Sequence, residues 1–117
     1  MVYKFLCPCH DFYIGQTKRL LKIRIEDHQR PSSGSHVCKH IENCSKYIHE
    51  ASQYAINCKN QYTSPKKAKF AFFMSRFSSI EKGFRNDQAR RNCEAYHIRL
   101  KRPKINDQKD LKAFRLF

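Results

Sequence analysis

The chain has 117 residues, 40% of them hydrophobic, which allows one domain with one modest core. No apolar run approaches the length of a membrane span, and the N-terminus lacks the apolar segment of a signal peptide, so we expect neither a membrane partner nor secretion. The net charge is +14, from 24 basic and 10 acidic residues. Because the cations occur in every segment, this charge favours a nucleic-acid partner over a role in solubility alone.

The first predicted elements are two strands, over residues 2–6 and 12–15. A tight Cys-Pro-Cys-His-Asp turn over 7–11 joins them, which predicts an antiparallel hairpin.

A helix is predicted next, from Thr17, which can cap it, to about Gln29. The Pro-Ser-Ser-Gly segment over 31–34 ends this helix. Arg24 and His28 are four residues apart and therefore lie on one stripe, which carries a guanidinium and an imidazole.

The rest of the chain has a less regular pattern. A second helix is predicted to begin at Ser35, whereas the polar residues 45–67 are interpreted as an irregular insertion. The aromatic segment 70–77 is typical of a strand, and a helix over 87–101 is stopped by Pro103. These elements predict a small α/β domain with a central, mainly antiparallel sheet flanked by helices, covering the whole chain, 1–117.

Several polar and glycine residues follow one another in an order found in a known nuclease family. In chain order they are Tyr3, Tyr13, Gly15, Arg24, His28, Glu94 and Asn106. With Val-Tyr on the first strand, Tyr-Ile-Gly on the second and a closing Pro-x-x-Asn, the chain resembles a GIY-YIG endonuclease domain. The cysteines between the two strands make it most similar to the type attached to Penelope-like retroelements. Met1 replaces the family's first glycine, so we expect a truncated first strand with a frayed start.

The resemblance implies hydrolysis of a phosphodiester bond. Arg24 would hold two phosphate oxygens, since its planar fork keeps its charge. Tyr3 would act as the base, with Tyr13 and His28 orienting water and phosphate and Gly15 leaving room for the substrate. An unperturbed tyrosine titrates near pKa ~10, so a base at pH 7 needs a depression of about three units, or roughly 4 kcal/mol.

Glu94 is the candidate ligand for Mg²⁺ or Mn²⁺, because magnesium takes one or two carboxylates plus water and phosphate oxygens. The alternative is a solvated helix charge paired with Arg90 or Arg91. For Tyr3 and Tyr13, the alternative is ordinary strand packing.

A second set of residues has the donor types of a zinc site. Cys7 and Cys9 lie in the predicted turn, and His40 and Cys44 are spaced to face one way on a helix. Two thiolates, an imidazole and a third thiolate would form a closed tetrahedral site for structural Zn²⁺.

Other assignments of the cysteines stay open. His36 and Cys38 are alternative ligands, whereas Cys58 and Cys93 are predicted to be buried as small apolar residues. The competing hypothesis is a disulfide framework among all six cysteines, which the missing signal peptide disfavours.

The densest basic stretches are expected to bind backbone phosphates without reading sequence. Their residues are Lys66, Lys67, Lys69, Arg99, Lys101 and Arg102. The phenylalanines at 70, 72 and 73 are predicted to belong to the core rather than to a base-stacking platform.

The sequence therefore predicts a metal-dependent endonuclease that nicks DNA, intracellular and nuclear, with a reverse transcriptase domain as a partner in a parent polyprotein. Two alternatives stay open. One is an inactive remnant that still binds DNA. The other is a zinc-stabilised nucleic-acid-binding module, which would not gather Tyr3, Tyr13, Arg24 and Glu94 in one cleft.

Overall fold

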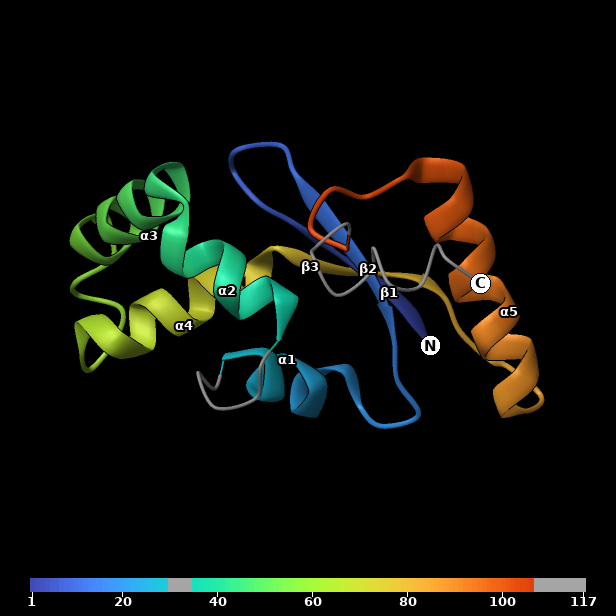
Figure 1. Cartoon of the computed structure of the whole chain (residues 1–117). Coiled ribbons are helices and arrows are strands. Elements are labelled where there is room, and N and C mark those ends of the chain that lie inside the picture. The colour runs from blue at the N-terminus through green and yellow to red at the C-terminus, as the bar shows by residue number, and fades with distance from the viewer. Residues whose placement is uncertain (30–34, 107–117) are drawn as a thin grey trace.

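A three-stranded antiparallel sheet with strand order β2-β1-β3 lies at the centre of the molecule (Figure 1). The computed structural model describes residues 1–29 and 35–106. In this part of the chain the strands are β1 (Val2–Leu6), β2 (Phe12–Gln16) and β3 (Phe77–Glu81). The helices are α1 (Leu21–Gln29), α2 (His36–Asn43), α3 (Ser45–Asn57), α4 (Pro65–Ser75) and α5 (Asp87–Lys101). The predicted small α/β fold with an antiparallel sheet is therefore confirmed.

The first two strands form the predicted hairpin. Its register places Tyr3 opposite Gly15. A hydrogen bond of 2.9 Å from the backbone nitrogen of Cys7 to the carbonyl of Asp11 closes the turn. The turn thereby holds its two cysteines at one end of the sheet.

The central strand is β1, which also pairs with β3 and places Phe5 opposite Phe77. Since β1 is paired from Val2 onward on both sides, the expected fraying at its start is not found. The amino group of Met1 adds a hydrogen bond of 2.6 Å to the carbonyl of Thr17. The middle of the sheet is therefore the most enclosed part of the described chain, and residues on β1 are well fixed.

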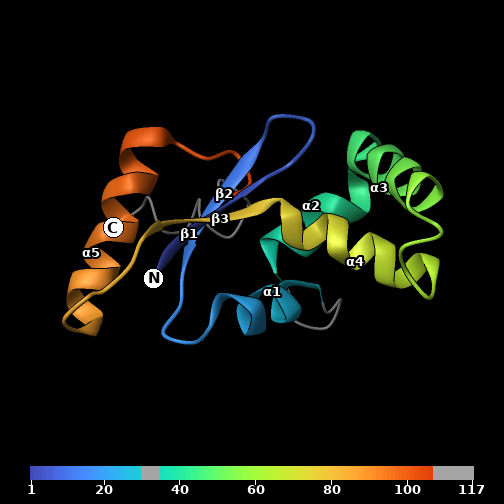
Figure 2. The ribbon, with the colours of Figure 1, turned by 180° about the vertical axis from the view of Figure 1, so that it is seen from behind.

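The helices are distributed unevenly around the sheet. In Figures 1 and 2, α5 lies at one end of the molecule and packs on β2, while α3 and α4 form a pair at the other end. Helix α2 lies between α1 and α3 and contacts both. The principal extents are 48 × 30 × 25 Å. None of the helices in the described residues has the length and apolar character that crossing a membrane requires.

Helix α1 begins later than the sequence predicts. Thr17 does not cap it, because its hydroxyl accepts a hydrogen bond from the backbone nitrogen of Arg19 at 3.0 Å and so stabilises a turn instead. The helix starts at Leu21, later than predicted. It ends at Gln29, where its end is predicted. The predicted end signal over 31–34 lies outside the described residues.

The predicted irregular insertion over 45–67 is wrong, since most of it is helix α3. Tyr47, Ala51 and Ala55 recur every four residues and form the buried face of this helix. The sulfur of Cys44 accepts a hydrogen bond from the backbone nitrogen of Tyr47 at 3.5 Å, an unusual cap that sequence preferences do not suggest.

The predicted strand over 70–77 is also wrong, because α4 occupies most of it and β3 begins only at Phe77. Ser64 caps α4 by accepting a hydrogen bond from the backbone nitrogen of Lys67 at 3.3 Å, and Pro65 occupies the first turn. Both residues favour a helix start. Phe72 is buried in the core, as are Phe73 and Phe77, and Phe70 packs against the core, as predicted.

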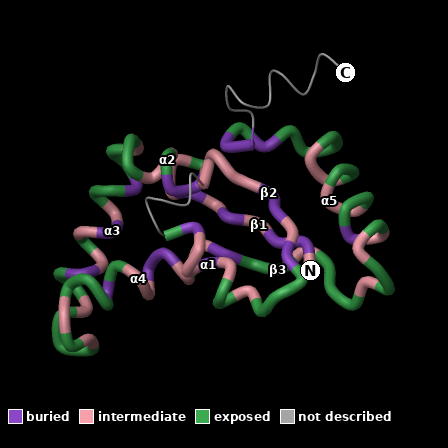
Figure 3. The backbone as a smooth tube through the Cα atoms, turned by 60° about the horizontal axis from the view of Figure 1, so that its bottom comes forward, coloured by how far each residue is buried: buried purple, intermediate pink, exposed green. Residues whose placement is uncertain are grey.

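Burial follows β1, the middle of β2 and the inner faces of α1, α3 and α4. The outer turns of α3 and α5 are exposed, as is most of β3 beyond Phe77 (Figure 3). All six cysteines are free thiols, so the disulfide framework is absent from this structure. Cys58 and Cys93 are half-buried, not buried as predicted.

Candidate functional site

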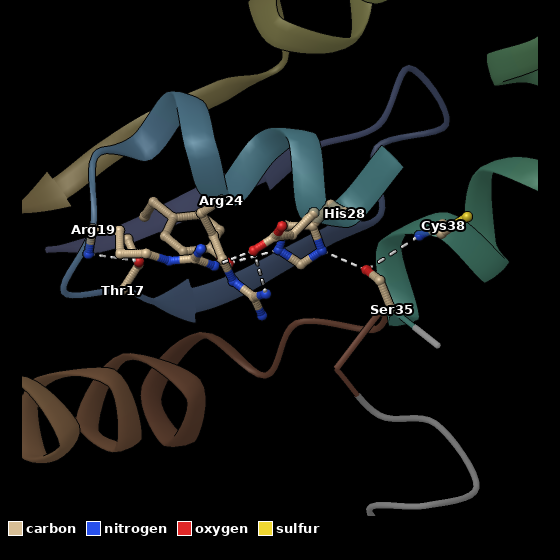
Figure 4. Close-up of polar contacts among 8 residues, drawn as sticks. Thr17, Arg19, Arg24, His28, Ser35 and Cys38 are labelled. Carbon is tan, nitrogen blue, oxygen red and sulfur yellow. Dashed lines mark hydrogen bonds and ion pairs between the residues drawn. The ribbon is translucent and has the colours of Figure 1, made fainter. Parts of the chain in front are cut away.

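Tyr3, Arg24 and His28 meet between the sheet and α1. The Tyr3 hydroxyl lies 2.6 Å from Nε2 of His28 and accepts a hydrogen bond from Nε of Arg24 at 3.2 Å. Figure 4 shows Arg24 and His28 side by side on the face of α1 that looks toward the strands. The i, i+4 spacing on α1 therefore delivers a guanidinium and an imidazole to one phenol.

Burial sets the protonation of this group. It lowers the pKa of His28 to about 4, assisted by the charge of Arg24, so this imidazole is neutral at pH 7. Burial also raises the pKa of Tyr3, assisted by Tyr13, while Arg24 opposes the change. The Tyr3 hydroxyl is therefore protonated and donates to the unprotonated Nε2 of His28. The direction of this change in pKa is opposite to the depression that a base at pH 7 requires.

The second nitrogen of His28 reaches a further helix. In the tautomer just derived, Nδ1 carries the proton and donates to the hydroxyl oxygen of Ser35. The same oxygen accepts a hydrogen bond from the backbone nitrogen of Cys38 at 3.4 Å and so caps α2 (Figure 4). Ser35 is predicted from the sequence only as a helix start, and its contact with His28 is not predicted. The sequence does offer a signal for this contact, because Ser35 begins a helix only seven residues after His28.

Tyr13 and Glu94 complete the group. The rings of Tyr13 and His28 pack edge to face, with centroids 5.4 Å apart. The carboxylate of Glu94 lies near enough to raise the pKa of Tyr3 and of Tyr13, although burial contributes more in both cases. Burial also raises the pKa of Glu94, against the influence of Arg24. The structure thus brings Tyr3, Tyr13, Arg24, His28 and Glu94 into one electrostatic neighbourhood.

Exposure separates these five residues into two sets. Tyr3 is 0% exposed and His28 1% exposed, so both lie beneath the surface. Tyr13, Arg24 and Glu94 are half-buried and keep part of their surface open to solvent. A ligand would therefore first meet the phenol of Tyr13, the guanidinium and the carboxylate.

Gly15 provides room for the Tyr3 ring. A Cβ atom at Gly15 would lie 2.5 Å from the hydroxyl of Tyr3 and 2.7 Å from Cε1 of Tyr13. Contacts this short are not tolerated, so no other residue fits here without moving a tyrosine. The space that was predicted to seat a phosphodiester is filled by the Tyr3 ring.

Asn106 binds the outer edge of β2, the edge that no other strand of the described chain pairs with. Its Oδ1 accepts a hydrogen bond from the backbone nitrogen of Ile14 at 2.7 Å, and its Nδ2 donates to the Ile14 carbonyl at 2.8 Å. The side-chain amide thus satisfies both backbone groups of one edge residue, as a neighbouring strand would. Asn106 has a structural position in this site and fixes β2 beside Gly15.

Arg90 was considered only as an alternative partner of Glu94. It is buried, and its guanidinium donates to the side-chain oxygen of Gln16 and, at 3.0 Å, to Asp87. These bonds tie α5 to the end of β2 and so help to place Glu94. The sequence contains 24 basic residues, and nothing in its local pattern marks Arg90 as the buried one.

Cys7, Cys9, His40 and Cys44 form a separate cluster at the end of the hairpin. Their ligand atoms all lie within 4.8 Å of one another. The sulfurs of Cys7 and Cys44 are 3.7 Å apart, and the sulfur of Cys9 lies 3.4 Å from Nε2 of His40. The hairpin turn supplies two donors, and the end of α2 with its junction to α3 supplies the others. The cluster could hold a metal ion.

The alternative ligands lie outside this cluster. The thiol of Cys38 donates to the carboxylate of Glu42 at 3.4 Å, and His36 is not among the four converging residues. Burial lowers the pKa of His40, which leaves its imidazole neutral at pH 7 and able to act as a metal ligand.

The two basic groups are far apart. Lys66, Lys67 and Lys69 are exposed on α4, whereas Arg99 and Lys101 are exposed on the last turns of α5, with Arg102 at its end. Figures 1 and 2 place α4 and α5 at opposite ends of the molecule, on either side of the sheet. The structure therefore does not join the predicted phosphate-binding residues into one patch.

No protein-family model, curated protein or solved structure matches this chain. The features of the described chain that bear on function are therefore the five-residue group around Tyr3 and the Cys/His cluster.

Proposed function

We propose that this chain is a divalent-metal-dependent endonuclease that hydrolyses a phosphodiester bond of DNA and leaves a nick. The observation that carries the proposal is the Tyr3 hydroxyl, held between Arg24 and His28 with Glu94 nearby. A phenol, an imidazole, a guanidinium and a carboxylate are the groups that such a hydrolysis requires for proton transfer and charge stabilisation.

Arg24 has the clearest role. It keeps exposed surface, and its guanidinium is oriented from below by the Tyr3 hydroxyl. A guanidinium fixed on one side can present its remaining N–H groups to two oxygens of a phosphate. Arg24 would therefore position the scissile phosphate and stabilise the charge that develops in the transition state.

Tyr3 and His28 form a proton path in this proposal. A phenol oxygen has one proton to donate and two lone pairs. His28 takes the proton and Arg24 occupies one lone pair, which leaves the other lone pair for an attacking water. The proton of that water would pass to Tyr3 as the proton of Tyr3 passes to Nε2 of His28. Tyr3 can then act as a base without becoming a free phenolate, which its burial disfavours.

Glu94 fits the role of a magnesium ligand. It is half-buried, and its carboxylate lies near enough to Arg24 and Arg90 for both to oppose the rise in its pKa. Hard oxygen ligands of this kind suit Mg²⁺ or Mn²⁺, with water and phosphate supplying the other positions. When bound, the ion would act as a Lewis acid on the phosphate oxygens and lower the pKa of bound water.

DNA is the proposed substrate because of the net charge of +14. The exposed lysines of α4 and the basic end of α5 would contact phosphates on either side of the site, without reading bases. A nuclear protein that works beside a reverse transcriptase domain is the cellular setting that the retroelement resemblance implies.

The Cys/His cluster is proposed to bind structural Zn²⁺. Ligand bonds of about 2.0–2.3 Å in a tetrahedral site place neighbouring donors roughly 3.3–3.8 Å apart. The distances of 3.7 and 3.4 Å in the cluster already fall in this range. The ion would join the hairpin turn to α2, whose first turn holds His28 through Ser35.

The nuclease proposal is tested by nicking of supercoiled plasmid with Mg²⁺, together with DNA binding at two salt concentrations. Glu94→Gln should lower nicking by orders of magnitude and keep or raise affinity, since counterion release by the basic residues is untouched. Arg24→Ala should lose activity and some affinity. Glu50→Gln, on the remote helix α3, is the matched control and should nick like wild type.

Two results would contradict the proposal. Equal nicking by wild type and Glu94→Gln would remove the metal role of the glutamate. Strong salt-dependent binding without nicking by any form of the protein would identify an inactive remnant.

Zinc is tested separately by the metal content of purified protein and by thermal unfolding with and without chelator. Cys44→Ser should lose the ion and unfold at a lower temperature, whereas Cys58→Ser should do neither. A zinc-free wild type, or a melting temperature that chelator leaves unchanged, would rule the site out.

A further inference from the structure

A second group of metal-binding residue types lies where β3 ends against α5. Glu81 is the last residue of β3, and Cys93 and His97 are four residues apart on α5 and therefore on one face. One ligand atom from each lies within 4.8 Å of the others. These residues come from two elements that are joined only through the connection 82–86, so the cluster depends on the tertiary fold.

The distances fit a common ion. Nε2 of His97 lies 3.5 Å from Oε1 of Glu81. Donors of a tetrahedral zinc site are roughly 3.3–3.8 Å apart, as estimated from bond lengths of about 2.0–2.3 Å. The Glu81 side chain is exposed, and the three ligand atoms lie within 4.8 Å of one another.

The histidine ring has an unsatisfied nitrogen. Nδ1 of His97 is buried and has no hydrogen-bond partner within residues 1–29 and 35–106. Nε2 is the nitrogen that faces Glu81, so Nε2 would bind the ion and Nδ1 would carry the ring proton. An imidazole can use either nitrogen as a metal ligand.

We propose that Glu81, Cys93 and His97 bind a second zinc ion, with water in the fourth position. One oxygen, one sulfur and one nitrogen donor form a mixed set that suits Zn²⁺, whereas Mg²⁺ prefers oxygen alone. The site is distinct from the cysteine-rich cluster of the hairpin turn and does not depend on the proposed nuclease function.

The ion would attach α5 directly to the end of β3. Cys93 precedes Glu94 in the chain, and the two side chains lie on neighbouring stripes of the same helix. An ion on one stripe would therefore fix the position of the other relative to the sheet. Three protein ligands and a partly exposed location predict a weaker and more readily exchanged ion than a closed four-ligand site.

The test is the number of ions bound by the full chain, measured by zinc titration and native mass spectrometry. Wild type should bind two Zn²⁺ per chain. Cys93→Ser and Glu81→Gln should each bind one, and Cys44→Ser should also bind one, at the second site. Glu81→Gln changes an exposed side chain and so keeps the test valid if Cys93→Ser fails to fold. Cys58→Ser is the matched thiol control and should bind two.

Substitution with Co²⁺ gives an independent readout, because cobalt bound to a thiolate absorbs strongly. Cys44→Ser should retain a cobalt–thiolate band that disappears when Cys93→Ser is added. A Cys44→Ser variant that binds no ion, or a Glu81→Gln variant with the same stoichiometry and affinity as wild type, would overturn the proposal.

Discussion

The hydroxyl of Tyr3 lies 2.6 Å from Nε2 of His28, and this contact joins the central strand of the sheet to α1. Both residues are almost completely buried, so the hydrogen bond is shielded from water. A buried imidazole with a pKa of about 4 binds its proton less readily than it does in the unfolded chain. The contact therefore has consequences for stability as well as for the proposed chemistry.

Acid should destabilise the protein through His28. The unfolded histidine titrates near pKa 6.5 and the folded one near 4, so between these values the unfolded state binds more protons. Stability should fall as pH decreases through this window, by about 3 kcal/mol at its lower end. Urea unfolding from pH 7 to pH 4 measures the slope, and His28→Gln should flatten it. An unchanged slope in His28→Gln would show that other groups dominate.

Ser35→Ala should lower the stability of the fold by more than the loss of an ordinary helix cap does. Ser64 caps α4 as Ser35 caps α2, and loss of either cap costs about 1 kcal/mol. Ser35→Ala also leaves Nδ1 of His28 buried without its acceptor, which adds about 1–3 kcal/mol. Urea unfolding of the two variants measures the difference directly. Equal losses would mean that the contact with His28 contributes nothing to stability.

Gly15→Ala should destabilise the fold by about 1–3 kcal/mol, because the new methyl group overlaps the Tyr3 ring. The cause can be isolated with a double-mutant cycle. In a Tyr3→Ala background the same change should cost much less, since the ring that it meets is gone. Additive losses in the cycle would contradict the steric explanation.

Asn106→Ala should lower stability by about 1–3 kcal/mol, because it leaves both backbone groups of Ile14 without these partners. Asn43→Ala is the matched control: Asn43 is exposed and makes a single bond of 2.9 Å to the carbonyl of Lys39. Chemical denaturation of both variants is the measurement. A similar, small loss in both would indicate that Asn106 is dispensable for the fold.

The sequence predicts the elements near the two ends of the described chain better than those in its middle. Alternation along β1 and β2 and the Asn86 cap of α5, which accepts a hydrogen bond from Ala89 at 2.8 Å, are local signals, so those elements are correct. Ser64 and Pro65 lie in the segment that the sequence predicts to be irregular, although a Ser followed by Pro is typical of a helix start. The phenylalanines that follow fit the spacing of a strand or of a helix. Their place in α4 depends on packing of Phe72 against α3 and of Phe73 against β1 and β3.

The candidate site was predictable in its members but not in its chemistry. The spacing of Arg24 and His28 indicates a shared face, and the Cys/His donors indicate a metal site. Burial of Tyr3 and the direction of its pKa change arise only when β1 becomes the central strand, which no local pattern reveals. The partner of His28 on α2 is likewise a product of tertiary structure.

The strand order β2-β1-β3 has a consequence for how the chain folds. The hairpin of β1 and β2 closes a short loop and can form early, but Phe5 meets Phe77 only after most of the chain has been synthesised. Until then one edge of β1 stays unpaired, and such an edge can pair with another chain. Refolding yield should therefore fall as protein concentration rises, and changes that delay β3, such as a loss of α4, should promote aggregation during synthesis.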